Sequence, residues 1–330
     1  MRRENNRTID KYLKRIQHEL RLLSFHYGLV SSLGDPNVNQ IEITNACNYR
    51  CPMCPQSTTM TRSIEYMDFS FYKKIFRKLY PSNLPIYLHL LGEPLMHPDL
   101  EKMIRYGKSR GHEIGVFTNG SLLTEENSRK IIAAGLDYLV ISFEVFEETF
   151  NQLRKGGNFN QVRENVINFL KLKGLKRKPR VTISSITLTK EERFEHGFWR
   201  SKVDKFIEKE IHDWSGDVPK ITRIAGRKRT GRKTCLLPWI RMAVLVDGKV
   251  VPCCVDYDGK YVVGDLKTDS LKSVWNGGKM NKLRKALLEG RKGDIELCSK
   301  CTLGSEVKGI LRTRLHLLYR TKSLISRVYA

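Results

Sequence analysis

The sequence predicts an α/β protein: a partial, TIM-like barrel of six strand–helix units, followed by a smaller domain. Short apolar runs alternate with helical patterns from about residue 40 to residue 214, and this alternation is typical of βαβ units and a parallel sheet. Six such units can be counted, two fewer than a full eight-fold barrel contains. The eight cysteines fall into two groups, one at the start of the predicted barrel and one in the region after it.

Composition and charge limit the class of protein. The chain has 330 residues, of which 40% are hydrophobic, so we expect a substantial core rather than disorder. It contains no run of the roughly 20 apolar residues that a membrane-spanning helix needs. The amino-terminal residues lack the apolar segment of a signal peptide, and we therefore expect a cytoplasmic protein. The net charge of +24 favours acidic partners, such as phosphorylated substrates, nucleic acid or anionic lipid, although a solvated basic surface explains it equally well.

The first predicted region, residues 1–37, is a basic amphipathic helix. Its apolar side chains recur at helical spacing among Lys and Arg residues and are Ile9, Tyr12, Leu13, Ile16, Leu20 and Leu23. Such a helix either packs against the main domain, which we expect here, or lies on a membrane surface.

The second predicted region, residues 38–219, is the barrel. Its strands are expected at 41–44, 86–91, 113–118, 138–143 and 181–186, with a weaker one at 206–214. Helices are expected at 71–79, 100–108, 125–134, 159–171 and 191–202. Ser70 and Thr124 are the expected amino-terminal caps of the first and third of these helices.

Three further regions follow the barrel. Residues 220–234 contain no acidic side chain and are expected to form a basic linker. Residues 235–303 are expected to form the smaller domain, with a β-hairpin around Asp247-Gly248. Residues 304–330 have the pattern of a second basic amphipathic helix, which we expect to form a tail.

The first cysteine group has the spacing C-x3-C-x2-C, with Cys47, Cys51 and Cys54 directly after the first predicted strand. Three thiolates on one loop can bind three irons of a cubane and leave the fourth iron open, as a catalytic site requires. A zinc site needs a fourth ligand, and the nearest candidates, His89 and His97, lie on another unit. A redox C-x2-C pair leaves Cys47 without a role.

This cysteine loop and several later motifs resemble those of the radical S-adenosylmethionine (SAM) enzymes. In that family the motifs follow successive strands, as they do here: Gly92-Glu93-Pro94 is similar to an element that receives the methionine amino group. Thr118-Asn119-Gly120 resembles a turn near the ribose and methionine. The resemblance also implies cofactor contacts for Met53, beside the adenine, for Ser142 at the end of the fourth strand, and for Arg154. Here Met53 replaces an aromatic residue, Leu91 replaces a glycine, and Glu144 replaces an aspartate.

The second cysteine group combines two separated ligands with a later C-x2-C pair, a spacing that also suits a zinc ribbon. The order of features resembles instead the auxiliary-cluster extension of radical SAM enzymes, called SPASM or, in its shorter form, twitch. That resemblance implies one auxiliary [4Fe–4S] cluster on Cys235, Cys253, Cys298 and Cys301. Cys254 is left over, and we expect a buried structural thiol. The alternatives are that it replaces Cys253 as a ligand or donates a hydrogen atom.

The resemblance implies an iron–sulfur oxidoreductase that cleaves SAM to a 5′-deoxyadenosyl radical and abstracts hydrogen from its substrate. A fully ligated auxiliary cluster favours oxidation, with epimerisation as a second outcome. The short amino-terminal region favours a small-molecule or glycan substrate, such as a phosphorylated or lipid-linked sugar, over a peptide. A reduced flavodoxin- or ferredoxin-type protein is the implied electron donor. Peptide maturation remains the alternative reaction, and a zinc-containing nucleic-acid binder the alternative class, although no nucleic-acid motif is present.

Overall fold

The computed structural model describes residues 2–190, 192–211, 214–218, 221 and 234–301. Nearly all of the predicted linker at 220–234 and the whole predicted tail at 304–330 lie outside these residues.

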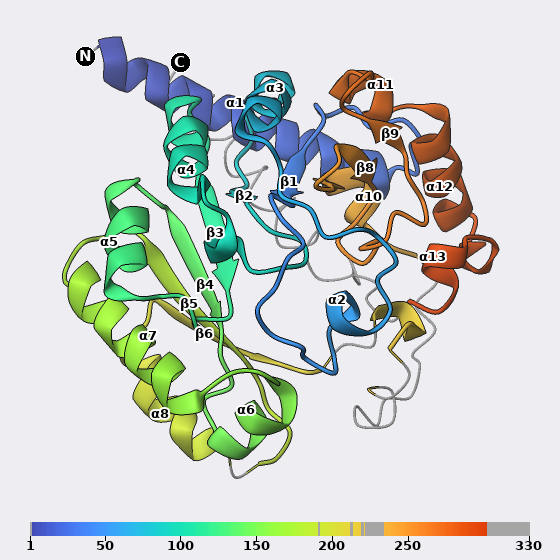
Figure 1. Ribbon diagram of the computed structural model, residues 1–330. Coiled ribbons are helices and arrows are strands. Elements are labelled where there is room, and N and C mark those ends of the chain that lie inside the picture. Colours follow the sequence, from blue (N-terminus) through green and yellow to red (C-terminus); the bar gives the residue numbers. More distant parts are fainter. Residues whose placement is uncertain (1, 191, 212–213, 219–220, 222–233, 302–330) are drawn as a thin grey trace.

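A single curved sheet organises the described part of the chain (Figure 1). Its strand order is β6-β5-β4-β3-β2-β1-β7-β8-β9. All pairings from β6 to β7 are parallel, and the last two are antiparallel. The strands are β1 (Val38–Ile41), β2 (Ile86–Tyr87), β3 (Ile114–Thr118), β4 (Tyr138–Ser142), β5 (Arg180–Ile186), β6 (Lys205–Lys209), β7 (Met242–Val244), β8 (Lys249–Val251) and β9 (Gly264–Asp265). The predicted partial barrel is therefore confirmed, and its sheet continues into the carboxyl-terminal region.

Strand β1 lies earlier in the sequence than predicted. The expected run was 41–44, whereas the strand is Val38–Ile41 and all four of its residues are buried. Its polar members Asn39 and Gln40 do not look like a strand core in the sequence. They are buried because β1 has a parallel neighbour on each side, β2 and β7, which encloses the strand within the sheet.

Helices follow the parallel strands and run around the outside of the sheet in Figure 1. They are α3 (Phe69–Lys78), α4 (Leu100–Ser109), α5 (Glu125–Ala133), α6 (Glu147–Leu153), α7 (Phe159–Lys173) and α8 (Arg193–Arg200). The Thr124 cap is confirmed, because its side chain accepts a hydrogen bond from the Asn127 backbone N–H. The Ser70 cap is wrong: Asp68 caps α3 by accepting from the backbone N–H groups of Ser70 and Phe71, and a carboxylate is well suited to that position.

The carboxyl-terminal region shares its core with the barrel. Its helical segments are α10 (Leu237–Ile240), α11 (Leu271–Trp275), α12 (Gly278–Leu288) and α13 (Glu296–Ser299), and its predicted hairpin is confirmed as β7 and β8. One hydrophobic cluster runs without interruption from Leu22 through the barrel to Leu297. The two regions therefore pack as one body along β1 and β7.

The amino-terminal helix α1 (Arg2–His26) packs on the carboxyl-terminal region rather than on the barrel helices alone. Phe25 contacts the Trp239 ring edge-on at 5.0 Å. The indole N–H of Trp275 donates to the Gly34 carbonyl at 2.9 Å, and the buried Arg284 donates to the carbonyls of Pro238 and Val30. These contacts attach the segment after α1 firmly to α10–α12.

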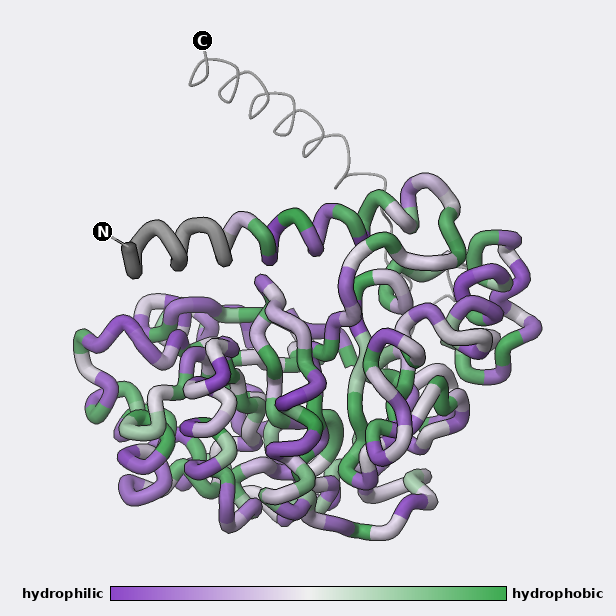
Figure 2. The backbone as a smooth tube through the Cα atoms, turned by 90° about the horizontal axis from the view of Figure 1, so that it is seen from above, coloured by the Kyte–Doolittle hydropathy of each residue, from purple (hydrophilic) through white to green (hydrophobic). Residues whose placement is uncertain are grey.

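The other side of α1 faces solvent. In Figure 2 the coloured part of this helix lies along one border of the molecule, and hydrophobic and hydrophilic residues alternate along it. Tyr12, Leu13 and Ile16 are more than half exposed. No helix among the described residues has both the length and the apolar character needed to cross a membrane.

Candidate active site

The first cysteine group lies on the loop between β1 and the short helix α2 (Pro55–Thr58). The Cys54 backbone N–H donates to the Cys51 carbonyl at 3.0 Å, which folds the loop into a turn. The three thiols are close enough to affect one another electrostatically. Burial is the main reason why the pKa of Cys47 rises to about 11 and that of Cys54 to about 12. A bound metal reverses this effect, because its positive charge stabilises the thiolates.

The arrangement fits a cubane better than a single ion. Among the residues that the structure describes, no three Cys, His, Asp or Glu side chains converge on one metal position. A cubane does not require such convergence, since each thiolate binds a different iron. Three thiols on one buried loop are a suitable donor set for a cluster with one open iron.

The Thr-Asn-Gly turn contacts the cysteine loop directly. The Asn119 amide nitrogen donates to Asn48 Oδ1 at 2.9 Å and lies 4.0 Å from Cys47 Sγ. Ser121 completes the network, because its hydroxyl accepts from Asn48 and donates to Asn119. Asn119 is therefore in a position to orient one of the predicted cluster ligands.

The Gly-Glu-Pro element is held between the same two loops. Glu93 Oε2 accepts from the Asn119 backbone N–H at 2.7 Å, and Oε1 accepts from the Leu95 backbone N–H at 3.0 Å. Burial raises the pKa of Glu93 to about 7, against the opposing effect of these hydrogen bonds. Gly92 has a φ of +76°, and a Cβ atom there would lie 2.6 Å from the Thr44 carbonyl oxygen. Only glycine allows this backbone to approach the cysteine loop so closely.

Arg154 lies next to the cysteine loop and forms a buried ion pair with Glu144. Its Nη2 donates to Glu144 Oε1 at 2.7 Å, and Glu144 is fully buried. The guanidinium also contacts the Cys51 thiol, and its pKa is raised because Glu144 and Cys51 outweigh the effect of burial. The sequence assigned Glu144 no role. Its side chain holds the charge of Arg154 next to the predicted cluster.

A large cavity opens where the parallel strands end. It has a volume of about 1070 Å³ and receives residues from all six barrel strands, β1 to β6, or from the loops that follow them. Ser142 lies on its wall, whereas Met53 is buried beside it and accepts a hydrogen bond from the Trp214 indole through its carbonyl. The residues that line the cavity are Gln40, His89, Leu90, Phe117, Ser142, Thr187, Leu188, Thr189, Lys190, Arg193, Glu208, Lys209, Glu210, Trp214, Arg241, Cys254 and Val255.

The second cysteine group surrounds a small apolar pocket. Cys235, Cys253, Cys298 and Cys301 all line it, together with side chains such as Leu283 and Leu297. Burial raises the pKa of Cys298 to about 12 and that of Cys253 as well. The structure thus brings together the four thiols that the sequence selected.

Cys254 faces the opposite way from its neighbour. Its side chain lines the large cavity, and its sulfur lies 3.8 Å from Arg241 Nη2. Val255 lines both the large cavity and the cysteine pocket. Val255 therefore belongs to the walls of both sites.

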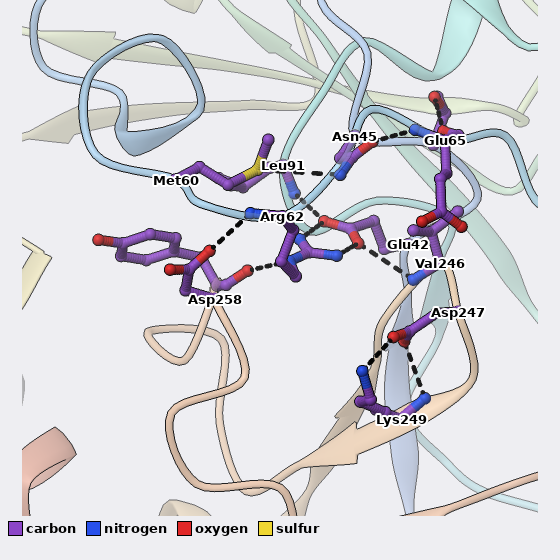
Figure 3. Close-up of polar contacts among 12 residues, drawn as sticks. Glu42, Asn45, Met60, Arg62, Glu65, Leu91, Val246, Asp247, Lys249 and Asp258 are labelled. Carbon is purple, nitrogen blue, oxygen red and sulfur yellow. Dashed lines mark hydrogen bonds and ion pairs between the residues drawn. The ribbon is translucent and has the colours of Figure 1, made fainter.

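A second buried ion pair joins Glu42 and Arg62 (Figure 3), and no sequence motif indicates it. Two guanidinium nitrogens of Arg62 donate to the Glu42 carboxylate at 2.7 and 2.8 Å. Glu42 also accepts from the Val246 backbone N–H at 3.1 Å, while Arg62 Nε donates to the Tyr257 carbonyl. This pair joins β1 and the segment after the cysteine loop to the carboxyl-terminal region.

Comparison with known proteins agrees with this architecture. Residues 41–196 match the family model of the radical SAM superfamily, and residues 235–302 match SPASM, an iron–sulfur cluster-binding domain. Together the two matches include both cysteine groups.

Two sequence relatives differ in how much of their length is matched. The chain is 23% identical over 267 residues to an S-adenosyl-L-methionine-dependent 2-deoxy-scyllo-inosamine dehydrogenase from Niallia circulans, and the match covers 79% of this chain and 91% of that protein. It is 34% identical over 118 residues to a tungsten-containing aldehyde ferredoxin oxidoreductase cofactor-modifying protein from Pyrococcus furiosus. That match covers 35% of this chain and 33% of the relative.

Solved structures share the fold. The crystal structure of BtrN in complex with AdoMet and 2-DOIA has a TM-score of 0.58 at 21% identity, over 81% of this chain and 94% of BtrN. Streptococcus suis SuiB bound to the precursor peptide SuiA has a TM-score of 0.59 at 13% identity, over 83% of this chain and 72% of SuiB.

The cysteine loop at the end of β1, the strand-end motifs and the two matched domains lead to one conclusion. The chain belongs to the radical SAM superfamily: it is an iron–sulfur enzyme with a domain that binds SAM and a [4Fe–4S] cluster, followed by a SPASM auxiliary-cluster domain.

Proposed function

We propose that this enzyme dehydrogenates a small-molecule or glycan-type substrate bound in the large cavity. The observation that carries the proposal is the shared wall: the cavity is bounded by barrel strand ends on one side and by Arg241, Cys254 and Val255 of the SPASM region on the other. Because Val255 also lines the pocket of the second cysteine group, a substrate in this cavity lies between the two predicted clusters.

The proposed ligands of the first cluster are Cys47, Cys51 and Cys54, and those of the auxiliary cluster are Cys235, Cys253, Cys298 and Cys301. Placement of Cys253 in the pocket, with Cys254 in the cavity, supports Cys253 as the ligand. When bound, the first cluster and SAM supply a 5′-deoxyadenosyl radical, and the auxiliary cluster can accept one electron.

The proposed SAM contacts are Met53, Gly92, Glu93, Pro94, Thr118, Asn119, Ser142 and Arg154. Glu93 and Asn119 position the cysteine loop through hydrogen bonds in this structure. Arg154 holds a positive charge beside Cys51, where it stabilises the thiolate form. Ser142 offers a hydroxyl to the cavity from the end of β4.

The extent of the matches supports oxidation of a small molecule. The 2-deoxy-scyllo-inosamine dehydrogenase is matched over 91% of its length, and BtrN over 94%. The relative named PqqA peptide cyclase, from Bradyrhizobium diazoefficiens, is matched over 31% of its length.

Isotope transfer tests the proposed reaction. The anaerobically reconstituted enzyme is incubated with SAM, a reductant and deuterated candidate sugars or sugar phosphates, and 5′-deoxyadenosine is examined by mass spectrometry. We expect deuterium in 5′-deoxyadenosine and a product that is three mass units lighter than its deuterated substrate, because one deuterium and one proton are removed. Deuterium transfer from a peptide, with none from any sugar or cyclitol, would favour peptide maturation instead. A product of inverted configuration that keeps the total number of hydrogen and deuterium atoms of its substrate would favour epimerisation.

A Cys298→Ala variant distinguishes the role of the auxiliary cluster from that of the first cluster. Loss of this proposed ligand is expected to remove the auxiliary cluster, so that SAM is still cleaved without substrate but no oxidised product accumulates. Iron content should fall from about eight atoms per chain to about four. An unchanged product yield would exclude an electron-accepting role for the second cysteine group.

Two partners complete the proposal. A reduced flavodoxin- or ferredoxin-type protein supplies the electrons, and its surface should be acidic because the chain carries a net charge of +24.

We further propose a cytoplasmic location with peripheral membrane contact through Tyr12, Leu13 and Ile16 of α1, which are exposed. Sedimentation with anionic and with neutral lipid vesicles tests this contact.

A further inference from the structure

Two cations on the wall of the large cavity, Lys209 and Arg241, have no obvious structural role. Lys209 is the last residue of β6, and its ammonium group lies 5.8 Å from the centre of the Phe117 ring. Arg241 lies between α10 and β7. Its Nη2 contacts Cys254 Sγ at 3.8 Å, and its Nε is buried without a hydrogen-bond partner among the described residues.

Among the described residues, neither cation forms an ion pair with a carboxylate. In the described ranges, Arg193 at the same cavity is paired with Glu208 at 3.1 Å, and Arg154 is paired with Glu144. No such ion pair involves Lys209 or Arg241 within those ranges. Desolvation lowers the pKa of Lys209, and the nearby positive charge of Arg154 adds to this effect, which outweighs the opposing influence of Cys254 and Glu144. Keeping an uncompensated cation in a partly desolvated site is unfavourable.

The rest of the lining is suited to a hydroxylated molecule. Gln40, Ser142, Thr187 and Thr189 supply amide and hydroxyl groups around the cavity. His89 stacks on Phe117 with ring centres 4.3 Å apart, and its Nδ1 is buried without a partner among the residues that the structure describes. These groups can hydrogen-bond to a polyol, whereas the two cations need an anion.

We propose that Lys209 and Arg241 form an anion subsite, and that the substrate of this enzyme is a polyol or sugar that carries a phosphate or carboxylate group. This inference rests on the proposed function, which it narrows to an anionic substrate. Lysine contributes a point charge and arginine a bidentate donor, a combination that suits phosphate oxygens. An amine, such as the inosamine of the Niallia relative, would be repelled by these charges.

The carboxylate of SAM is a second possible partner for the two cations, and the test must separate it from the substrate. Lys209→Gln and Arg241→Gln remove one charge each, and Arg241→Lys restores the charge without the fork of donors. Lys130→Gln is the matched control, because Lys130 is exposed on α5 and pairs with Glu126.

Binding to the reconstituted holoenzyme is measured by anaerobic calorimetry with inorganic phosphate, glucose 6-phosphate and myo-inositol as probes, and with SAM in parallel. We expect glucose 6-phosphate to bind with a Kd of about 1 mM or tighter. Lys209→Gln and Arg241→Gln should each weaken this binding by about tenfold or more, since a hydrogen bond to a charged group is lost. Arg241→Lys should recover part of it, and Lys130→Gln should bind like the wild type.

Three results would overturn the inference. In the first, neither phosphate compound binds the wild type. In the second, the Gln variants bind the phosphate compounds as tightly as the wild type does. In the third, the same variants weaken the binding of SAM as much as they weaken the binding of the phosphate compounds. The third result would assign the cations to the cofactor. Substrate-independent formation of 5′-deoxyadenosine by the wild type reports separately on the radical machinery, so a failure of the anion subsite is distinguishable from a failure of the proposed function.

Discussion

Replacement of Glu42 by Gln should destabilise the protein far more than an ordinary loss of charge. Glu42 is fully buried, Arg62 is 13% exposed, and two hydrogen bonds of 2.7 and 2.8 Å join them. A Gln side chain keeps the shape but leaves the guanidinium without its counter-charge, and it turns one acceptor atom into a donor. Removing one partner of such a pair costs about 3–5 kcal/mol of unfolding free energy.

The assay is urea unfolding of the anaerobically reconstituted protein, followed by tryptophan fluorescence. Trp199 lies in the barrel, whereas Trp239 and Trp275 lie in the carboxyl-terminal region. Because the ion pair joins these two regions, the transition of Glu42→Gln should also become broader than that of the wild type. The control is Glu126→Gln, which alters an exposed pair on α5 and should leave the unfolding curve unchanged.

A double variant distinguishes the loss of this ion pair from a general failure to fold. Glu42→Gln combined with Arg62→Met removes both charges, so the double variant should regain part of the lost stability. The reasoning is refuted if Glu42→Gln unfolds within about 1 kcal/mol of the wild type, which is the range of an average substitution.

Three further predictions test the site and the fold. Cys51→Ala should abolish 5′-deoxyadenosine formation, and continued formation would mean that the first cluster is assigned to the wrong cysteines. Gly92→Ala places a Cβ atom 2.6 Å from a backbone oxygen of the cysteine loop and should lower iron content and SAM cleavage. Gly111→Ala, which has a similar φ but open space around it, should do neither. Burial lowers the pKa of His112 to about 4, so the unfolded chain binds more protons than the native one below about pH 6.5. Unfolding free energy should therefore fall from pH 7.5 to pH 5.5, and less steeply in His112→Gln; equal slopes would contradict this.

The alternation of strands and helices could be predicted because it follows from local patterns of apolar residues. Strand β1 was misplaced because its burial comes from two neighbouring strands and not from its own hydropathy. The parallel pairing of β7 with β1 had no signal at all, since a β-hairpin motif identifies its own two strands but not the strand beside them.

Parts of the candidate site could likewise be predicted from the sequence, whereas other parts could not. Both cysteine groups and the strand-end motifs are short sequence patterns and could be recognised as such. Glu42 and Arg62 come together only because a loop folds back over β1. Lys209 and Arg241 lie on different elements and share a cavity wall only in the folded chain. Tertiary contacts of this kind leave no periodicity or fixed spacing in the sequence.

The position of β1 between β2 and β7 has a consequence for synthesis on the ribosome. Val38 is paired with Met242. Strand β1 can therefore pair with β7 only after roughly 200 further residues have been synthesised, and such distant pairings form late in folding. The loop with Cys47, Cys51 and Cys54 follows β1 directly, and its backbone is supported from the same side by Glu42, which accepts from Val246. Loading of the first cluster is therefore expected to follow release of the nearly complete chain, which makes iron–sulfur assembly a post-translational step for this enzyme.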